Sequence, residues 1–125
     1  KNFPNPDCIR YELHRVWVVD AKLKEGARHI YARRTFYIDE DTWQPAIVDQ
    51  YDGRGELWKL KEGHMMTHYN KQTPWLAVEI LYDLLSGRYL TIGLDNEMPG
   101  NQYHFEIEAS ESDYTPAALR RSGKR

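Results

Sequence analysis

Two histidines in the middle of the chain have the spacing of a metal-binding pair. His64 and His68 are four positions apart, which places both imidazoles on one face when the segment is a zinc-binding helix. The residues between them, Met65-Met66-Thr67, lack the glutamate that such a helix supplies. In a strand the same spacing separates the two histidines by about 13 Å, too far to share one ion. Because the surrounding sequence predicts a strand, we expect no metal site.

The remaining reactive side chains match no common catalytic motif. Gly53 and Gly55 resemble the start of a dinucleotide-binding fingerprint, but Trp58 stands where the third glycine belongs. The serines lie in a predicted turn and near the C-terminus, outside any Gly-x-Ser-x-Gly elbow: Ser86, Ser110, Ser112 and Ser122. Two carboxylates that act as general acid and general base need to be close only in space. Their spacing in the sequence therefore selects no pair among the nineteen Asp and Glu residues. We therefore expect neither an enzyme nor a cofactor.

An acidic run, Asp39-Glu40-Asp41, could attract calcium. An EF-hand loop that starts at Asp39 would need glycine at its sixth position and glutamate at its twelfth, where this chain has Gln44 and Gln50. A solvated acidic turn between two strands is the interpretation that the sequence favours.

Alternation of apolar and polar residues predicts that a long antiparallel hairpin opens the fold. In the run at 9–23, Leu13 and Trp17 fall on one side of the predicted strand. After a short polar connection that contains a glycine, Ile30 and Phe36 share one side of the next run. Period-two geometry makes each of these pairs co-facial, while the register between the two strands stays open.

Further strands and one helix complete the predicted architecture. Runs separated by Gly- or Asp-containing turns predict strands at 46–48, 57–69, 75–82 and 88–94, with a last edge strand at 103–107. Thr115 can cap a helix that has Pro116 at its first position and ends near Gly123. The fold class is therefore mainly β: a curved antiparallel meander sheet with a short C-terminal helix, in a single domain over residues 1–125.

Composition narrows the class of partner. The net charge is −2, without a clustered basic face, so nucleic acid is not an expected ligand. No run reaches the roughly 18 apolar residues that span a bilayer. Aromatic residues make up 13% of the chain, and such side chains suit either a packed core or a sheet face that is partly wet. Cys8 has no partner for an internal disulfide, and Lys1 in place of an initiator Met suggests either an excised fragment or a processed mature terminus.

Six strings along the chain carry a resemblance to known proteins. They are RYELHRVWVV at 10–19, RHIY at 28–31, FYIDEDTW at 36–43, YDGRGELW at 51–58, GLDNE at 93–97 and YTPAALRR at 114–121. Together they resemble the bacterial domain-of-unknown-function family thirteen-twenty-nine, which is often described as outer-membrane lipoprotein-sorting-like. The resemblance covers essentially the whole chain.

The resemblance implies that the chain is similar to the C-terminal part of an exported protein of several hundred residues, with a signal peptide and a place in the Gram-negative periplasm. It also implies a distant relation to the LolA/LolB carriers, whose curved antiparallel sheet wraps acyl chains. The present sheet is then a portion of a LolA/LolB-like half-barrel. The family supplies no catalytic or binding motif that can be mapped onto this sequence.

These observations favour a periplasmic, non-catalytic binder or carrier of a lipid, lipoprotein or other hydrophobic cargo, which would bury acyl chains reversibly. The expected ligand is a hydrophobic small molecule or acyl chain, and the expected state is a monomer. The alternative is an accessory interaction module of an envelope exporter complex, since an exposed apolar face serves both functions. The predicted cargo lining, which could equally be core, is Leu13, Trp17, Ile30 and Phe36 from the first hairpin and Trp58 from a later strand.

Overall fold

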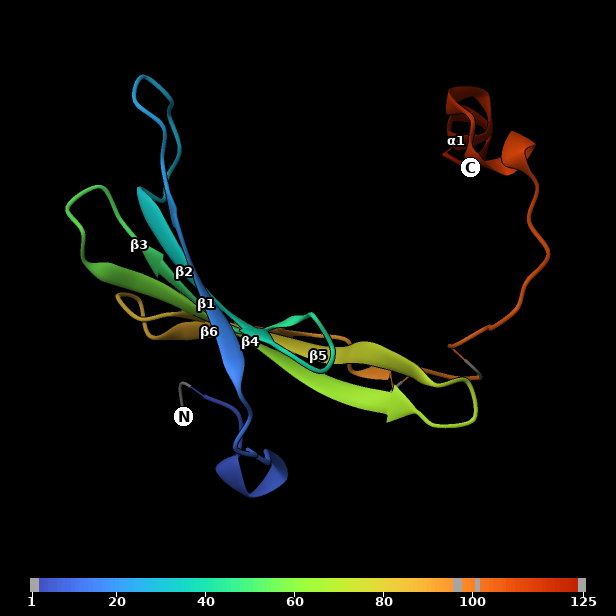
Figure 1. Ribbon diagram of the computed structural model, residues 1–125, viewed down its shortest axis with the longest axis horizontal. Coiled ribbons are helices and arrows are strands. Elements are labelled where there is room, and N and C mark those ends of the chain that lie inside the picture. The colour runs from blue at the N-terminus through green and yellow to red at the C-terminus, as the bar shows by residue number, and fades with distance from the viewer. Residues whose placement is uncertain (1–2, 96–97, 101, 124–125) are drawn as a thin grey trace.

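The computed structural model describes residues 3–95, 98–100 and 102–123, and a single antiparallel sheet lies at its centre. The sheet has six strands, and strands consecutive in the chain are neighbours throughout (Figure 1). The strands are β1 (Val16–Lys22), β2 (Arg33–Asp39), β3 (Pro45–Tyr51), β4 (Leu57–His68), β5 (Thr73–Asp83) and β6 (Arg88–Ile92). The 3-10 helices η1 (Pro6–Cys8) and η3 (Glu111–Tyr114) and the α-helix α1 (Pro116–Ser122) lie outside it. The predicted fold class, a mainly β chain with an open curved meander and a short C-terminal helix, is confirmed.

β1 and β2 form the predicted first hairpin, with shorter strands than the alternation indicated. Pairing begins at Val16, and the register places Trp17 opposite Ile38 and Val19 opposite Phe36. The connection between the two strands is longer than the predicted three-residue turn, and a backbone hydrogen bond of 2.9 Å between residues 23 and 32 is the last before it opens.

Residues 9–15, predicted as the beginning of the first strand, are extended but unpaired. Their side chains contact later strands: Tyr11 bonds to Glu62 and His14 to Asp39. A segment that crosses the sheet cannot also run along β2 as a hydrogen-bonded neighbour. The strand prediction from alternation was therefore wrong over these residues.

The later strands follow the predicted order. β4 and β5 occupy the runs predicted at 57–69 and 75–82. β6 stops at Ile92 instead of continuing to residue 94, because Gly93 takes a φ of 89° and leaves the ladder.

The predicted edge strand at 103–107 is not formed. The ring centroids of Tyr103 and Phe105 lie 5.1 and 4.9 Å from that of His68, and Tyr103 also meets Trp75 edge-on at 5.6 Å. Aromatic packing against side chains of β4 and β5 has replaced backbone pairing at the edge. The alternation cannot distinguish these two outcomes, since both place Tyr103 and Phe105 against neighbouring side chains of the sheet.

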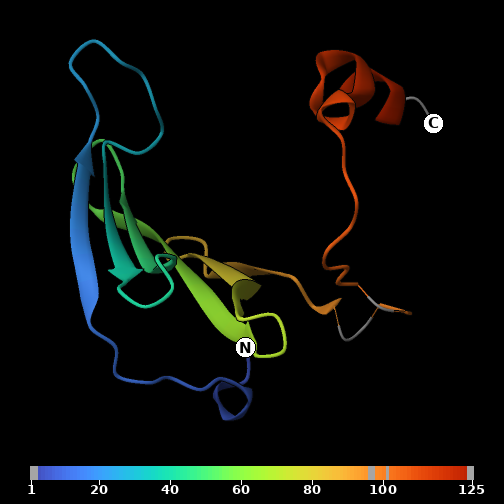
Figure 2. The same ribbon diagram turned by 45° about the vertical axis from the view of Figure 1, so that its right-hand side comes forward.

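The C-terminal helix α1 has the predicted cap. Thr115 Oγ1 accepts a hydrogen bond of 3.2 Å from Ala118 N, and Pro116 occupies the first helical position. Gly123 follows the last turn with a φ of −81°, so it ends the helix without a left-handed conformation. Among the described elements α1 packs on η3 alone, and Figure 1 and Figure 2 show this part of the chain standing away from the sheet. Within the described residues, no helix has the length and apolar character needed to cross a membrane.

Alternation along the paired strands gives the sheet two faces. The Phe36 face carries a mostly apolar row that crosses all strands: Val19, Phe36, Val48, Lys61, Leu81 and Leu90. The opposite Glu62 face carries the neighbouring row: Val18, Tyr37, Ile47, Glu62, Ile80 and Thr91. Of the described apolar residues only Val48 and Ile80 are buried, and no described element forms a second layer over either face.

Gly93 is held against β5 more closely than an alanine would allow. A Cβ there would lie 2.2 Å from the carbonyl oxygen of Ala77, whereas Gly55, with a similar φ of 84°, has open space around it. Both Gly93→Ala and Gly55→Ala carry the cost of a left-handed alanine, about 1 kcal/mol. We expect Gly93→Ala to lower the free energy of unfolding by a further ~1–3 kcal/mol through this steric overlap. Urea denaturation of the two variants measures the difference, and equal midpoints would contradict the close approach.

Candidate functional site

A short extended segment, residues 9–15, leads from η1 to β1 and crosses the Glu62 face. In Figure 2 it runs along the bottom of the view from η1 to the start of β1. Tyr11 Oη donates a hydrogen bond of 2.9 Å to Glu62, and Arg15 Nε donates one of 2.6 Å to Glu40. The backbone contributes as well, because Glu40 N donates to the carbonyl oxygen of Arg15 at 3.3 Å. This crossing segment is thus tied to β4 and to the β2–β3 turn.

Glu62 is a buried carboxylate, 9% exposed, with two phenol donors. Tyr11 donates from the crossing segment at 2.9 Å, and Tyr82 donates from β5 at 2.8 Å. Burial, and then the hydrogen bond to Glu62, raises the pKa of both tyrosines, so both hydroxyls remain protonated donors. His64 Nε2 lies 3.6 Å from the same carboxylate, beyond hydrogen-bond distance, and this buried nitrogen has no hydrogen-bond partner in the described part of the chain.

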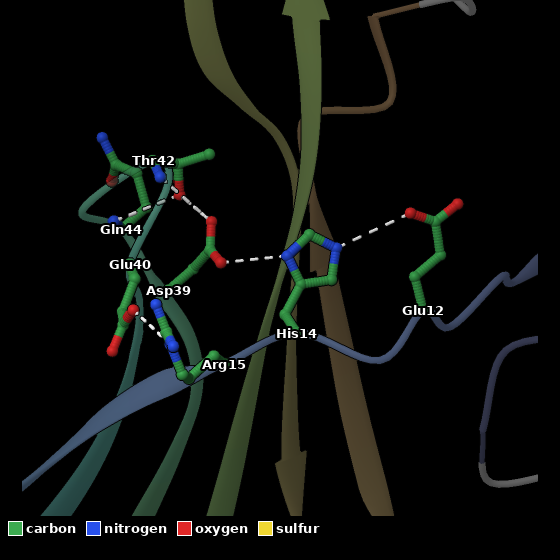
Figure 3. Close-up of polar contacts among 7 residues, drawn as sticks. All are labelled: Glu12, His14, Arg15, Asp39, Glu40, Thr42 and Gln44. Carbon is green, nitrogen blue, oxygen red and sulfur yellow. Dashed lines mark hydrogen bonds and ion pairs between the residues drawn. The ribbon is translucent and has the colours of Figure 1, made fainter.

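Asp39 is a second buried carboxylate, 4% exposed, at the start of the β2–β3 turn (Figure 3). Its Oδ2 accepts hydrogen bonds from Thr42 N at 3.0 Å and Thr42 Oγ1 at 2.7 Å, and its Oδ1 lies 3.0 Å from His14 Nδ1. Burial acts to raise the pKa of Asp39, but the hydrogen bonds from Thr42 and His14 outweigh it and leave the pKa lowered. The hydrogen bond to Asp39, with a smaller effect of Glu12, raises the pKa of His14.

The predicted solvated acidic turn is wrong for Asp39, which is buried. Asp41 is exposed as expected, and Glu40 is partly covered by its ion pair with Arg15. The three consecutive acids have different environments because the turn directs Asp39 onto Thr42 while Asp41 points to solvent.

Both buried carboxylates border a surface hollow of about 630 Å³. The hollow lies between the crossing segment, the β2–β3 turn and the end of β4 that extends past β3, since β3 pairs with β4 only as far as Glu62. Its charged side chains, apart from histidines, are four carboxylates and one arginine: Glu12, Asp39, Asp41, Glu62 and Arg10. Its apolar side chains are Ala46, Ile47, Met65 and Met66. This lining favours cations over anions.

The five residues predicted to line a cargo site are not brought together. Trp17 and Phe36 share the Phe36 face on neighbouring strands, and Trp17 is 55% exposed. Leu13 is fully exposed on the crossing segment, and Ile30 is exposed in the connection between β1 and β2. Trp58 lies at a bulge of β4, as the extra residue between the pairs Tyr51–Leu57 and Gln50–Lys59, and its ring meets a tyrosine of that connection edge-on at 5.8 Å. None of the five lines the hollow.

The residues that surround the hollow were missed because their partners are remote in sequence. Tyr11 and Glu62 are 51 residues apart, and His14 and Asp39 are 25 residues apart. No motif links such positions, since their contact depends on the course of the crossing segment. The available signal was the polar character of Glu12 and His14 within an otherwise strand-like run.

Removing one phenol donor tests the Glu62 cluster. Tyr82→Phe leaves the buried carboxylate with one hydrogen bond fewer, which should lower the free energy of unfolding by about 1.5–3 kcal/mol. Tyr114→Phe, on an exposed ring, should change it by less than about 0.5 kcal/mol. Chemical denaturation compares the two variants, and equal stabilities would show that Glu62 does not depend on Tyr82.

The His14–Asp39 pair should stabilise the fold over a limited range of pH. The pKa of His14 is higher in the folded state than its ordinary value of 6.5. His14 therefore stabilises the fold fully below pH 6.5, and this stabilisation is lost as the pH rises through the folded-state pKa. The pKa of Asp39 is lower in the folded state than its ordinary value of 3.8. Asp39 therefore stabilises the fold above pH 3.8, and this stabilisation is lost as the pH falls through the folded-state pKa. We therefore expect His14→Gln to lower Tm most between these two values and least at alkaline pH. The exposed His104→Gln is the control, and a pH-independent Tm difference for His14→Gln would contradict the pairing.

Comparison with known sequences places the chain among related proteins. The family model described as Protein of unknown function (DUF1329) matches residues 1–120. The uncharacterized protein PA3922 of Pseudomonas aeruginosa is 64% identical over 121 residues, which cover 97% of this chain and 26% of that protein. The chain thus spans about a quarter of the length of this relative.

Two solved structures share the fold at low sequence identity. A domain from Vibrio parahaemolyticus, described as an outer membrane lipoprotein-sorting protein domain, matches with a TM-score of 0.60 and 16% identity, over 85% of this chain and 42% of that one. A DUF1329 family protein from Desulfovibrio piger matches with a TM-score of 0.59 and 15% identity, over 83% of this chain and 40% of that one. Since the family model covers all but its last five residues, the chain belongs to the DUF1329 family.

Proposed function

We propose that the chain is part of a periplasmic binder or carrier of a lipid, lipoprotein or other hydrophobic cargo, acting without covalent chemistry. The observation that carries this proposal is the uncovered Phe36 face. Large apolar side chains stand exposed on it at both edges of the sheet: Trp17, Val19, Leu90 and Ile92. At each edge the exposed apolar side chains are neighbours on one face of one strand, and exposed apolar patches mark sites that bind other apolar groups.

The dimensions of the Phe36 face suit an extended acyl chain. Its apolar row crosses six strands, and five strand spacings of ~4.8 Å give a length of about 24 Å. This length exceeds the ~15 Å depth of one leaflet of a hydrocarbon core. Lys61 interrupts the row, but its charge is paired with Glu79 at 2.7 Å. Each methylene buried against such a surface contributes about 0.8 kcal/mol, so an acyl chain can supply useful affinity without a covalent step.

The fold comparison supports the same direction. The Vibrio domain, which has a similar fold, is described as an outer membrane lipoprotein-sorting protein domain. A protein that sorts lipoproteins must shield acyl chains from water while it acts, which is the task proposed for the Phe36 face. The periplasmic location belongs to the proposal, because it follows from that analogy.

An accessory interaction module of an envelope exporter complex is the second candidate, and the free sheet edges favour it. Within the described sheet β1 and β6 each pair on one side only, and such edges can accept a strand of another chain. Native mass spectrometry of the full-length protein, followed by organic extraction, separates the two functions. Extracted lipid supports the carrier, and a stoichiometric protein partner without lipid supports the module.

Trp17→Ala tests the cargo proposal directly. Because Trp17 is half exposed, its loss should leave the fold intact but weaken binding of a fluorescent fatty-acid probe by at least about fivefold, the effect of losing one large aromatic contact. Trp43→Ala is the matched control, since Trp43 is also exposed but lies in the β2–β3 turn. Equal probe affinities of the two variants and the parent would exclude Trp17 as a cargo contact.

A further inference from the structure

We propose that His14, Asp39 and Asp41 together bind one divalent transition-metal ion, of the class of Zn²⁺, at the rim of the hollow. Each residue offers one ligand atom, and these atoms all lie within 4.8 Å of one another. They come from two separate parts of the chain, since His14 belongs to the crossing segment, while Asp39 ends β2 and Asp41 lies in the turn that follows it. This site goes beyond the proposed cargo function, and its residues are distinct from those of the Phe36 face.

The distances suit a small ion after a minor rearrangement. A tetrahedral ion with bonds of about 2.1 Å separates its ligand atoms by roughly 3.4 Å. His14 Nδ1 and Asp39 Oδ1 are 3.0 Å apart, close to that spacing. The Asp41 carboxylate lies within 4.8 Å of both other ligand atoms, and its side chain is exposed, so the surrounding residues leave it room to move toward an ion. A metal ion would take the place of the hydrogen bond between His14 and Asp39.

Asp39 is held in the orientation that a ligand needs. Both hydrogen bonds from Thr42 fall on Oδ2, at 3.0 and 2.7 Å, which leaves Oδ1 directed toward His14 (Figure 3). Hydrogen bonds of this kind around a ligating carboxylate fix its geometry in metal sites. With Asp39 almost completely buried, its carboxylate cannot turn away into solvent.

The chemistry of the hollow also favours a cation. Four carboxylates face one arginine, and Arg10 is already paired with Glu12 at 2.9 Å. His64, on the wall of the same hollow, keeps a buried Nε2 without a hydrogen-bond partner in the described chain. One imidazole with two carboxylates suits first-row ions such as Zn²⁺ or Mn²⁺ better than Mg²⁺ or Ca²⁺, which prefer oxygen ligands alone. The sequence-based prediction of no metal site rested on the pair His64 and His68 and on a calcium-binding loop. It did not include His14, because His14 is 25 residues from Asp39 in the sequence.

Isothermal titration of chelator-treated protein with ZnCl₂ tests the site. We expect one Zn²⁺ per chain, with affinity at least about tenfold lower in both His14→Ala and Asp41→Asn. Asp41→Asn is the decisive variant, because Asp41 is exposed and its substitution leaves the contacts of Asp39 with Thr42 and His14 intact. The fold of this variant should be unchanged, which circular dichroism checks.

His104→Ala and Asp7→Asn are the matched controls on exposed positions, and both should bind Zn²⁺ like the parent. Absence of saturable Zn²⁺ binding would overturn the proposal, as would undiminished affinity in Asp41→Asn. Equal loss in the controls would assign the binding to scattered surface ligands and overturn it as well. Titration with MgCl₂ should give no comparable heat, and Mg²⁺ affinity equal to that for Zn²⁺ would reject the imidazole as a ligand.

Discussion

The antiparallel backbone ladder is the interaction on which the rest of this chain depends. Val48 and Ile80 are the buried apolar residues of the described chain. Burial of apolar side chains therefore contributes little to holding the strands in place. The order comes from hydrogen bonds between five consecutive pairs of strands. Register then decides which side chains stand in one row, and a slip of a single residue would exchange the two faces.

Buried polar side chains help to fix the structure, as an apolar core does in other proteins. Thr35, Asp39 and Glu62 are as buried as the two apolar residues, and each has a specific partner. Apolar contacts tolerate sliding, whereas hydrogen bonds to a buried carboxylate have a preferred direction and a high cost when one partner is removed. The crossing segment therefore has a defined position although no strand pairing holds it.

Sequence reasoning recovered the sheet because strand alternation and turn residues are local signals. β4, β5 and the capped helix α1 were predicted within a few residues, since Thr115 and Pro116 act on the backbone beside them. It failed where a segment with strand-like alternation makes tertiary contacts instead, as at residues 9–15 and 103–107.

The candidate site was beyond reach of the sequence for the same reason. Asp39 looked like one of three solvated acids, and only the path of the crossing segment brings His14 to it. Of the predicted cargo residues, Trp17 and Phe36 lie on one face in the register that the structure shows, whereas Leu13 and Ile30 lie outside the strands. The sequence predicts which side chains share one face of a strand. Which side chains of two strands lie next to each other depends on the register between the strands, and the sequence does not give that register.

The C-terminal arm has a consequence for how the molecule responds to proteases. Past the ion pair of Lys71 with Glu106, α1 contacts only η3 among the helices and strands that the structure describes, and the helix is seven residues long. Isolated helices of that length are marginal in water even with good caps, so the arm opens far more often than the ladder does. A protease that samples open backbone would clip the arm first and leave the sheet whole, unless a ligand or partner covers Leu119 and shields it.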